Sequence, residues 1–356
     1  MYNVTKGSTH EVMIKQKSMN TRPVRAASSL LGNSVFARLA VSIPVLVATA
    51  AGMPVQADAP RVVATIKPIH ALASSVMDGL GTPELLIRGL ASPHGLKLKP
   101  SQARLLARAE VVIWIGPGLE SDYERALKNL ASKAVLVTLQ AAEGVRIHKL
   151  REGGLWEAHD HHDHGHHDHG EKKHHQKKHG HDERRADVDA HIWLDPYNAI
   201  TMARAIAGTL AKVDAPNAAV YRANAAKTIA RLKALDAEIA QMLRPIRNKR
   251  YIVFHDAYQY FERRYRLAPV GSLTVDPHLA PPPSRLYDLR KRILERGAAC
   301  VFREPQFEPK IVNILVRGTP AKVGILDPLG ADLSPGKGAY AMLLRRLAAG
   351  LRSCLA

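Results

Sequence analysis

The sequence lacks the short motifs by which many hydrolases and nucleic-acid-binding proteins are recognised. It contains neither HExxH nor GxSxG, which mark zinc peptidases and serine hydrolases. It has no zinc-finger spacing, RNA-binding signature or basic patch interleaved with aromatic residues, although Lys and Arg (51) outnumber Asp and Glu (32). The positive charges are spread along the chain, so we do not expect nucleic-acid binding. Because the catalytic motifs are missing, we do not expect enzymatic turnover either.

The first 57 residues differ in composition from the rest of the chain. Several arginines precede an uncharged apolar stretch from Leu39 to Val55, and Val55-Gln56-Ala57 has the small-x-small pattern that signal peptidase cleaves. We therefore predict that residues 1–57 form a signal peptide and that the mature protein is exported. A retained membrane anchor is the alternative, but the stretch is short for a spanning helix and contains two prolines.

Cysteine is scarce, since only Cys300 and Cys354 occur. In an exported protein, an even number of cysteines indicates a disulfide bond. Cys300 opens a predicted strand and Cys354 lies in the last turn of a predicted C-terminal helix, so a bond between them would attach this helix to the sheet. Two buried thiols are the alternative.

Short β-branched runs alternate with amphipathic runs of helical period after residue 57, which is the pattern of βαβ units. We expect an α/β protein of two Rossmann-like lobes, each a small, mostly parallel sheet flanked by helices. The predicted boundaries are 58–213 for the N-terminal lobe, 214–247 for a linker helix and 248–356 for the C-terminal lobe. The predicted strands are Val62–Ile66, Glu84–Arg88, Val111–Ile115, Val135–Thr138 and His191–Leu194 in the first lobe, and Tyr251–Phe254, Val270–Leu273, Cys300–Arg303 and Lys322–Leu326 in the second.

The segment from Asp214 to Leu243 has no glycine and only one proline, near its start. As one continuous helix, this segment would extend about 45 Å. That length is too great for a crossover within a small lobe. We therefore predict one long, rigid helix that joins the two lobes.

A histidine-rich tract interrupts the N-terminal lobe. The 23 residues from His159 to His181 hold eleven of the eighteen histidines in the chain. Histidine mixed with aspartate offers metal ligands but no apolar side chains for a core. We therefore predict a disordered, metal-collecting loop over 157–189, with ligands at His159, His161, His162, His164, His166, His167, His169, His174, His175, His179 and His181.

Outside the tract, four side chains occupy similar places in the predicted pattern of strands and helices. His94 follows the strand ELLIR, His255 ends YIVFH, and Asp327 ends KVGILD. His191 lies beside a strand end in DAHIWLDP. In open α/β sheets, ligands bind beyond the carboxyl ends of the strands. Two of the four side chains come from each lobe, so they can meet only in the cleft between the lobes.

Three imidazoles and one carboxylate form a four-coordinate set that Zn²⁺ accepts. A hard ion such as Mn²⁺ would favour more carboxylates, and Cu(I) would favour Met or Cys. We therefore predict a zinc site made by His94, His191, His255 and Asp327. A water molecule in the fourth position is the alternative, because an aspartate after a strand commonly caps a turn.

The residues around these positions resemble the zinc-uptake solute-binding proteins (ZnuA-like) that serve ABC importers. The matching segments follow the order of the family: IKPIHALASSVMDG, LASPHGLKLKPSQARLLARAEVVIWIGPGLE, DAHIWLDP, FHDAYQYFE, CVFREPQF and GILDPLG. The resemblance implies that Zn²⁺ is bound between two lobes by His94, His191 and His255, with Asp327 in a fourth position that varies within the family. The histidine-rich insertion and the two cysteines also resemble this family.

The resemblance further implies a protein of the periplasm that delivers Zn²⁺ to an inner-membrane permease with its cytoplasmic ATPase. We also expect a monomer. An auxiliary periplasmic zinc chaperone is a further candidate partner. Two alternatives stay open from the sequence. One is a zinc hydrolase with an open fourth coordination position, and the other is a periplasmic zinc buffer or surface adhesin that meets no permease.

Overall fold

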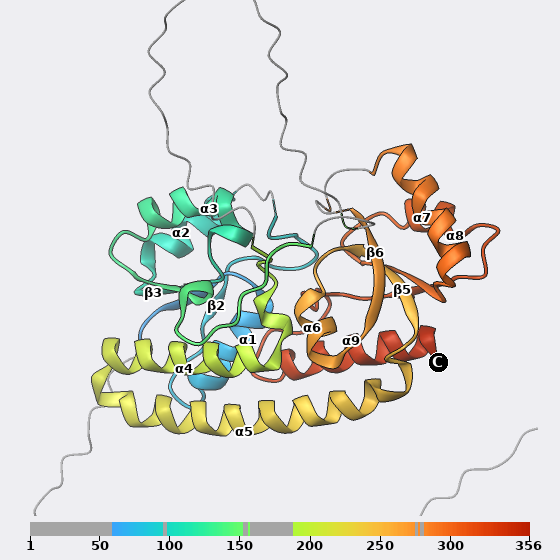
Figure 1. Cartoon of the computed structure of the whole chain (residues 1–356). Coiled ribbons are helices and arrows are strands. Elements are labelled where there is room, and N and C mark those ends of the chain that lie inside the picture. The colour runs from blue at the N-terminus through green and yellow to red at the C-terminus, as the bar shows by residue number, and fades with distance from the viewer. Residues whose placement is uncertain (1–58, 95–97, 152–155, 157–187, 275–276, 278–280) are drawn as a thin grey trace, which may run out of the picture. The chain divides into compact units, whose positions relative to one another are not determined.

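Two four-stranded sheets, each made of parallel strands, form the framework of the chain (Figure 1). The computed structural model describes residues 59–94, 98–151, 156, 188–274, 277 and 281–356. The predicted signal peptide over 1–57 and the eleven tract histidines lie outside the described residues. Both therefore stay predictions.

The first sheet has the strand order β2-β1-β3-β4, and all neighbouring strands are parallel. Its two central strands are apolar and buried along their whole length, as expected of a parallel sheet covered by helices. The first lobe consists of this sheet and its flanking helices. Its elements are β1 (Val62–Ala64), α1 (Lys67–Val76), β2 (Glu84–Leu85), α2 (Pro100–Arg108), β3 (Val111–Trp114), α3 (Pro117–Leu130) and β4 (Val135–Thr138).

The second sheet repeats this arrangement with the order β6-β5-β7-β8, again with parallel neighbours. The second lobe consists of this sheet with the helices between its strands. Its elements are β5 (Arg250–His255), α6 (Gln259–Tyr265), β6 (Ala268–Thr274), α7 (Pro283–Arg296), β7 (Cys300–Arg303), α8 (Lys310–Val316) and β8 (Lys322–Ile325). The predicted fold class of two α/β lobes is confirmed.

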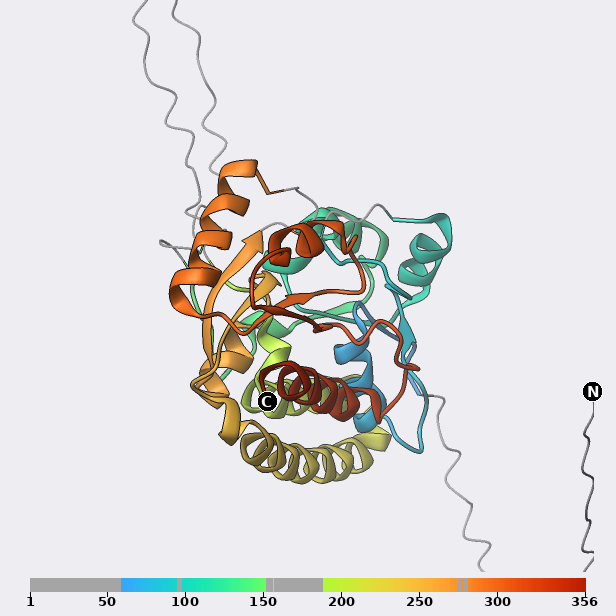
Figure 2. The same ribbon diagram turned by 90° about the vertical axis from the view of Figure 1, so that its right-hand side faces the viewer.

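Three long helices pack together on one side of the two sheets, with α5 against both of the others (Figure 1): α4 (Pro196–Val213), α5 (Ala218–Leu243) and α9 (Ala339–Leu355). Helix α5 packs against α1, α4 and α9, and the two views show it running along the outer side of α4 and α9 (Figures 1 and 2). Its 26 residues extend about 39 Å. None of the helices within the described residues is long and apolar enough to cross a membrane.

The long helix begins four residues later than predicted. The chain turns at Asp214, passes through a short 3₁₀ turn over Ala215–Asn217 and enters α5 at Ala218. The Asp214 carboxylate accepts hydrogen bonds from Asn217 Nδ2 (2.9 Å) and from the Tyr221 hydroxyl (2.7 Å). These contacts stabilise the reversal of direction between α4 and α5.

The C-terminal helix α9 is held close to the second sheet and also reaches the first lobe. It packs against β8, α5 and α1. A Cβ atom built on Gly350 would lie 2.6 Å from the Ile325 carbonyl oxygen, so only glycine allows this approach. The predicted disulfide bond between Cys300 and Cys354 is present and joins β7 to α9.

The predicted strand His191–Leu194 is wrong. Residues Ile192–Leu194 instead form a 3₁₀ turn that leads into α4, and His191 caps it. The three residues of the turn are fully buried, which explains why their apolar run suggested a strand. Asp195 accepts a hydrogen bond from the backbone N–H of Tyr197 (2.9 Å) and so starts α4 directly after the turn.

Candidate metal centre

Three histidines from distant parts of the chain meet between the two lobes. Each of His94, His191 and His255 offers a ring nitrogen, and these nitrogens all lie within 4.8 Å of one another. The ring centroids are 5.3 to 5.9 Å apart, and the Nε2 atoms of His191 and His255 are 3.4 Å apart. Within the described residues this is the one such group of His, Cys, Asp or Glu side chains. Its dimensions fit a single metal ion held by three nitrogens.

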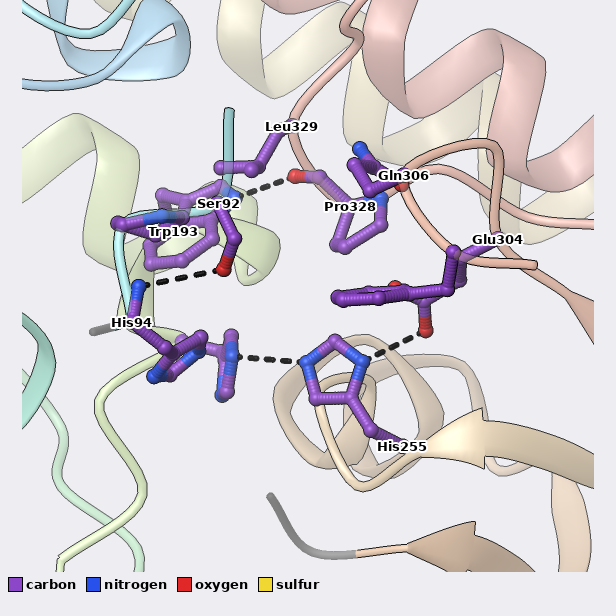
Figure 3. A pocket seen from close by; sticks show the side chains of 11 residues that line it. Ser92, His94, Trp193, His255, Glu304, Gln306, Pro328 and Leu329 are labelled. Atoms are coloured by element: carbon purple, nitrogen blue, oxygen red, sulfur yellow. Dashed lines mark hydrogen bonds and ion pairs between the residues drawn. The ribbon is translucent and has the colours of Figure 1, made fainter. Parts of the chain in front are cut away.

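Each histidine is placed by a different local structure. His255 is the last residue of β5, at the carboxyl end of the second sheet. His191 precedes the 3₁₀ turn before α4, and His94 lies in the loop that follows β2 of the first sheet. His191 and His255 are buried, whereas His94 is half-buried. Figure 3 shows His94 and His255 on facing sides of the cavity.

A buried aspartate orients the His191 ring. Asp189 is completely buried, and its Oδ1 lies 2.8 Å from His191 Nδ1 and accepts the His191 backbone N–H at 2.9 Å. A carboxylate at this distance favours the tautomer with hydrogen on Nδ1. The lone pair of Nε2 is then directed to the other two histidines, as a metal ligand requires.

A buried glutamate does the same for His255. Glu304 Oε1 lies 2.7 Å from His255 Nδ1, and Figure 3 shows this contact on the side of the ring away from His94. Burial disfavours the charged imidazolium, but the adjacent Glu304 carboxylate outweighs it and raises the pKa of His255 above the ordinary histidine value. The carboxylate therefore both fixes the tautomer and makes the ring a more basic ligand.

The sequence analysis missed Asp189 and Glu304. Both carried a signal, because Glu304 directly follows strand β7 and Asp189 lies two residues before a predicted ligand. Glu304 thus occupies the same carboxyl edge of the second sheet as His255. Asp189 and Glu304 orient proposed ligands and are not ligands themselves.

The cavity beside the histidines has mainly apolar walls. They are formed by Trp193, Phe307, Pro328 and Leu329, together with Pro93 and the polar residues Ser92, Glu304 and Gln306 (Figure 3). Apolar walls exclude water and strengthen electrostatic interactions within the site. A cation bound here would be shielded from bulk solvent on the sides that these residues cover.

The fourth predicted ligand, Asp327, is not part of the histidine group. Its Oδ1 accepts hydrogen bonds from Gln306 Nε2 (2.7 Å) and from the backbone N–H groups of Leu329 and Gly330 (both 3.0 Å). Its Oδ2 accepts the Ala331 N–H at 2.6 Å. Asp327 therefore caps the turn that follows β8.

Known proteins resemble this chain over most of its length. The chain matches the family model "ZnuA: Zinc-uptake complex component A periplasmic" over residues 62–354, a range that contains all three histidines. It is 46% identical over 304 residues to the high-affinity zinc uptake system protein ZnuA of Brucella abortus (strain 2308), covering 83% of this chain and 91% of that one. The protein of the same name from Paracoccus denitrificans is 41% identical, covering 86% and 94% of the two chains.

Solved structures give the same result for the fold. A crystal structure of ZnuA superposes with a TM-score of 0.68 at 27% identity, covering 84% of this chain and all of that one. A zinc-bound ZnuA deletion mutant gives a TM-score of 0.66 at 26% identity, covering 84% and 99%.

Proposed function

This chain belongs to the ZnuA family of periplasmic zinc-uptake components, and we propose that His94, His191 and His255 bind one Zn²⁺ ion as cargo. The observation that carries the proposal is the convergence of three ring nitrogens within 4.8 Å. Neutral imidazole is a preferred ligand of Zn²⁺. The carboxylates behind His191 and His255 hold both rings in the tautomer that leaves Nε2 available.

The fourth coordination position is open to two occupants. Asp327 lies outside the histidine group, and moving its carboxylate to the metal would disturb its hydrogen bonds to the backbone of Leu329, Gly330 and Ala331. A water molecule requires no such change. The hydrogen bonds that Asp327 already makes therefore support water as the fourth ligand. We propose that the turn following β8 stays capped, with water as the fourth ligand.

We further propose a carrier that works in the periplasm, not an enzyme. The mature chain would start after residue 57, act as a monomer and pass Zn²⁺ to an inner-membrane permease with its ATPase. The eleven tract histidines would raise the local zinc concentration through weak contacts, and an auxiliary periplasmic zinc chaperone is a candidate donor. The family supports a role in a zinc-uptake complex.

Zinc binding by the site is expected to weaken as the pH falls. Imidazole must be neutral to bind a metal, so each displaced proton reduces the apparent affinity. Since the pKa of His255 is raised, we expect the deprotonation of this ring alone to cost at least about fivefold, and at most about tenfold, in apparent zinc affinity between about pH 6.5 and 5.5. Equilibrium dialysis with metal analysis measures this, in a background where the eleven tract histidines are serine.

Glu304→Gln provides the matched variant for this experiment. Removing the carboxylate lowers the pKa of His255, so the loss of affinity should begin at a lower pH than in the parent. The parent should bind one tight Zn²⁺ per chain near neutral pH. No tight zinc in the parent, or a pH profile that Glu304→Gln leaves unchanged, would contradict the assignment.

A further inference from the structure

Helix α6 of the second lobe holds the segment that precedes His191. The Tyr260 hydroxyl donates a hydrogen bond to the Asp189 carbonyl oxygen (2.8 Å) and accepts one from the His148 N–H (2.9 Å). The Gln259 amide Nε2 lies 3.0 Å from the Lys149 carbonyl oxygen and 3.4 Å from Asp189 Oδ2. Asp189, which orients His191, is therefore itself held by two neighbouring residues of α6.

An ion-pair cluster extends the same contact. The Arg151 guanidinium pairs with Asp256 through Nε (3.0 Å to each carboxylate oxygen) and Nη2, and with Glu262 of α6 through Nη1 (2.7 Å). All three side chains are largely buried, and the guanidinium stacks on the Trp156 ring at 3.5 Å. Asp256 directly follows the ligand His255 in the chain. The segment from His148 to Arg151 pairs with Val188 and Asp189 ahead of His191, so these residues are tied to the residue next to His255.

The residues after His191 are also bound to the C-terminal part of the chain. The Trp193 indole Nε1 donates to the Pro328 carbonyl oxygen (2.8 Å), and the Tyr340 hydroxyl donates to the Trp193 carbonyl oxygen (2.7 Å). Pro328 lies just after β8, and Tyr340 lies in α9. His191 therefore lies between two sets of hydrogen bonds, and both sets lead to residues beyond β5.

His94 has a different attachment. It follows β2, which pairs with β1 in the first sheet, and its backbone N–H donates to Ser92 Oγ (3.2 Å) in the same loop. This loop belongs to the first lobe. The hydrogen bonds of Tyr260 and Gln259, by contrast, lead to His191 by way of Asp189.

We propose that α6 positions His191, with Tyr260 as the main positioning residue, an inference that rests on the proposed zinc site. The Tyr260 hydroxyl holds the Asp189 backbone, and the Asp189 carboxylate in turn orients the His191 ring. Loss of this hydroxyl should therefore impair zinc binding through His191 and not through His94.

The test is a double-mutant cycle on zinc affinity, measured by chelator competition in the full chain with the eleven tract histidines changed to serine. Tyr260→Phe removes only the hydroxyl group, and with it the hydrogen bonds to Asp189 and His148. Tyr265→Phe is the matched control, because it removes a hydroxyl on the same helix that bonds to Asp236 (3.1 Å), away from the site. Each is combined with His94→Ala and with His191→Ala.

We expect Tyr260→Phe to weaken zinc binding by about tenfold and Tyr265→Phe by less than about twofold. The loss caused by Tyr260→Phe should persist with His94→Ala and vanish with His191→Ala. An equal loss in both backgrounds would show a general structural effect and overturn the proposal, as would no loss in the parent. Absence of tight zinc in the parent would instead overturn the proposed function itself.

Discussion

Replacing His191 with alanine is expected to weaken zinc binding by more than about 100-fold, because removing a hydrogen-bond partner of a ligand already costs about 10- to 100-fold in other metal sites. His191 Nε2 lies 3.4 Å from that of His255, so in the proposed site its loss leaves two of the three histidine ligands. The measurement is the zinc dissociation constant from chelator competition, in the background without tract histidines. His255→Ala should behave alike, since its ring is oriented in the same way.

His70→Ala is the matched control for this experiment. His70 is also buried, but its Nε2 lies 2.9 Å from the Pro83 carbonyl oxygen, and burial lowers its pKa below the ordinary value. Its loss should change folding stability but leave the zinc dissociation constant within about twofold of the parent. If His191→Ala bound zinc as tightly as His70→Ala, the assignment of His191 would be wrong.

Removing the disulfide bond is expected to lower the free energy of unfolding by about 4 kcal/mol, the chain-entropy value for the separation between Cys300 and Cys354. The two cysteines are 54 residues apart, and both are buried, on β7 and α9. The double variant Cys300→Ala/Cys354→Ala should therefore unfold at a clearly lower urea concentration than the oxidised parent.

The reduced parent is the control for the double variant, because it lacks the bond but keeps both side chains. Its urea midpoint should lie close to that of the double variant and well below that of the oxidised protein. If the oxidised and reduced parent unfolded within about 1 kcal/mol of each other, the bond would not be a main source of stability.

Much of the fold could be predicted because strands and helices here follow simple local patterns. Eight of the nine predicted strands overlap an observed strand, as Val111–Ile115 does with β3. The exception is the predicted strand His191–Leu194, which forms a 3₁₀ turn. A short, fully buried apolar run is compatible with a strand or with a tight turn, and only the tertiary contacts of Trp193 decide between them.

The positions of His94 and His255 could be predicted because both follow strands, and the carboxyl ends of parallel strands share one edge of each sheet. The sequence places His191 beside a predicted strand that the structure replaces with a 3₁₀ turn. Asp189 and Glu304 were missed although both have suggestive positions, because their contacts with the ring nitrogens exist only in the folded chain. The role of Asp327 could not be decided from its sequence position. Its place at a strand end suits a ligand and a turn cap equally, and in the structure it caps the turn.

A crystal structure of the zinc-loaded protein, with anomalous data collected at the zinc edge, is the decisive test of the three-histidine site. We expect one strong anomalous peak between the lobes, within about 2.0–2.1 Å of a ring nitrogen of each of His94, His191 and His255. A zinc peak elsewhere in the folded chain, with these three rings sharing no ion, would contradict it.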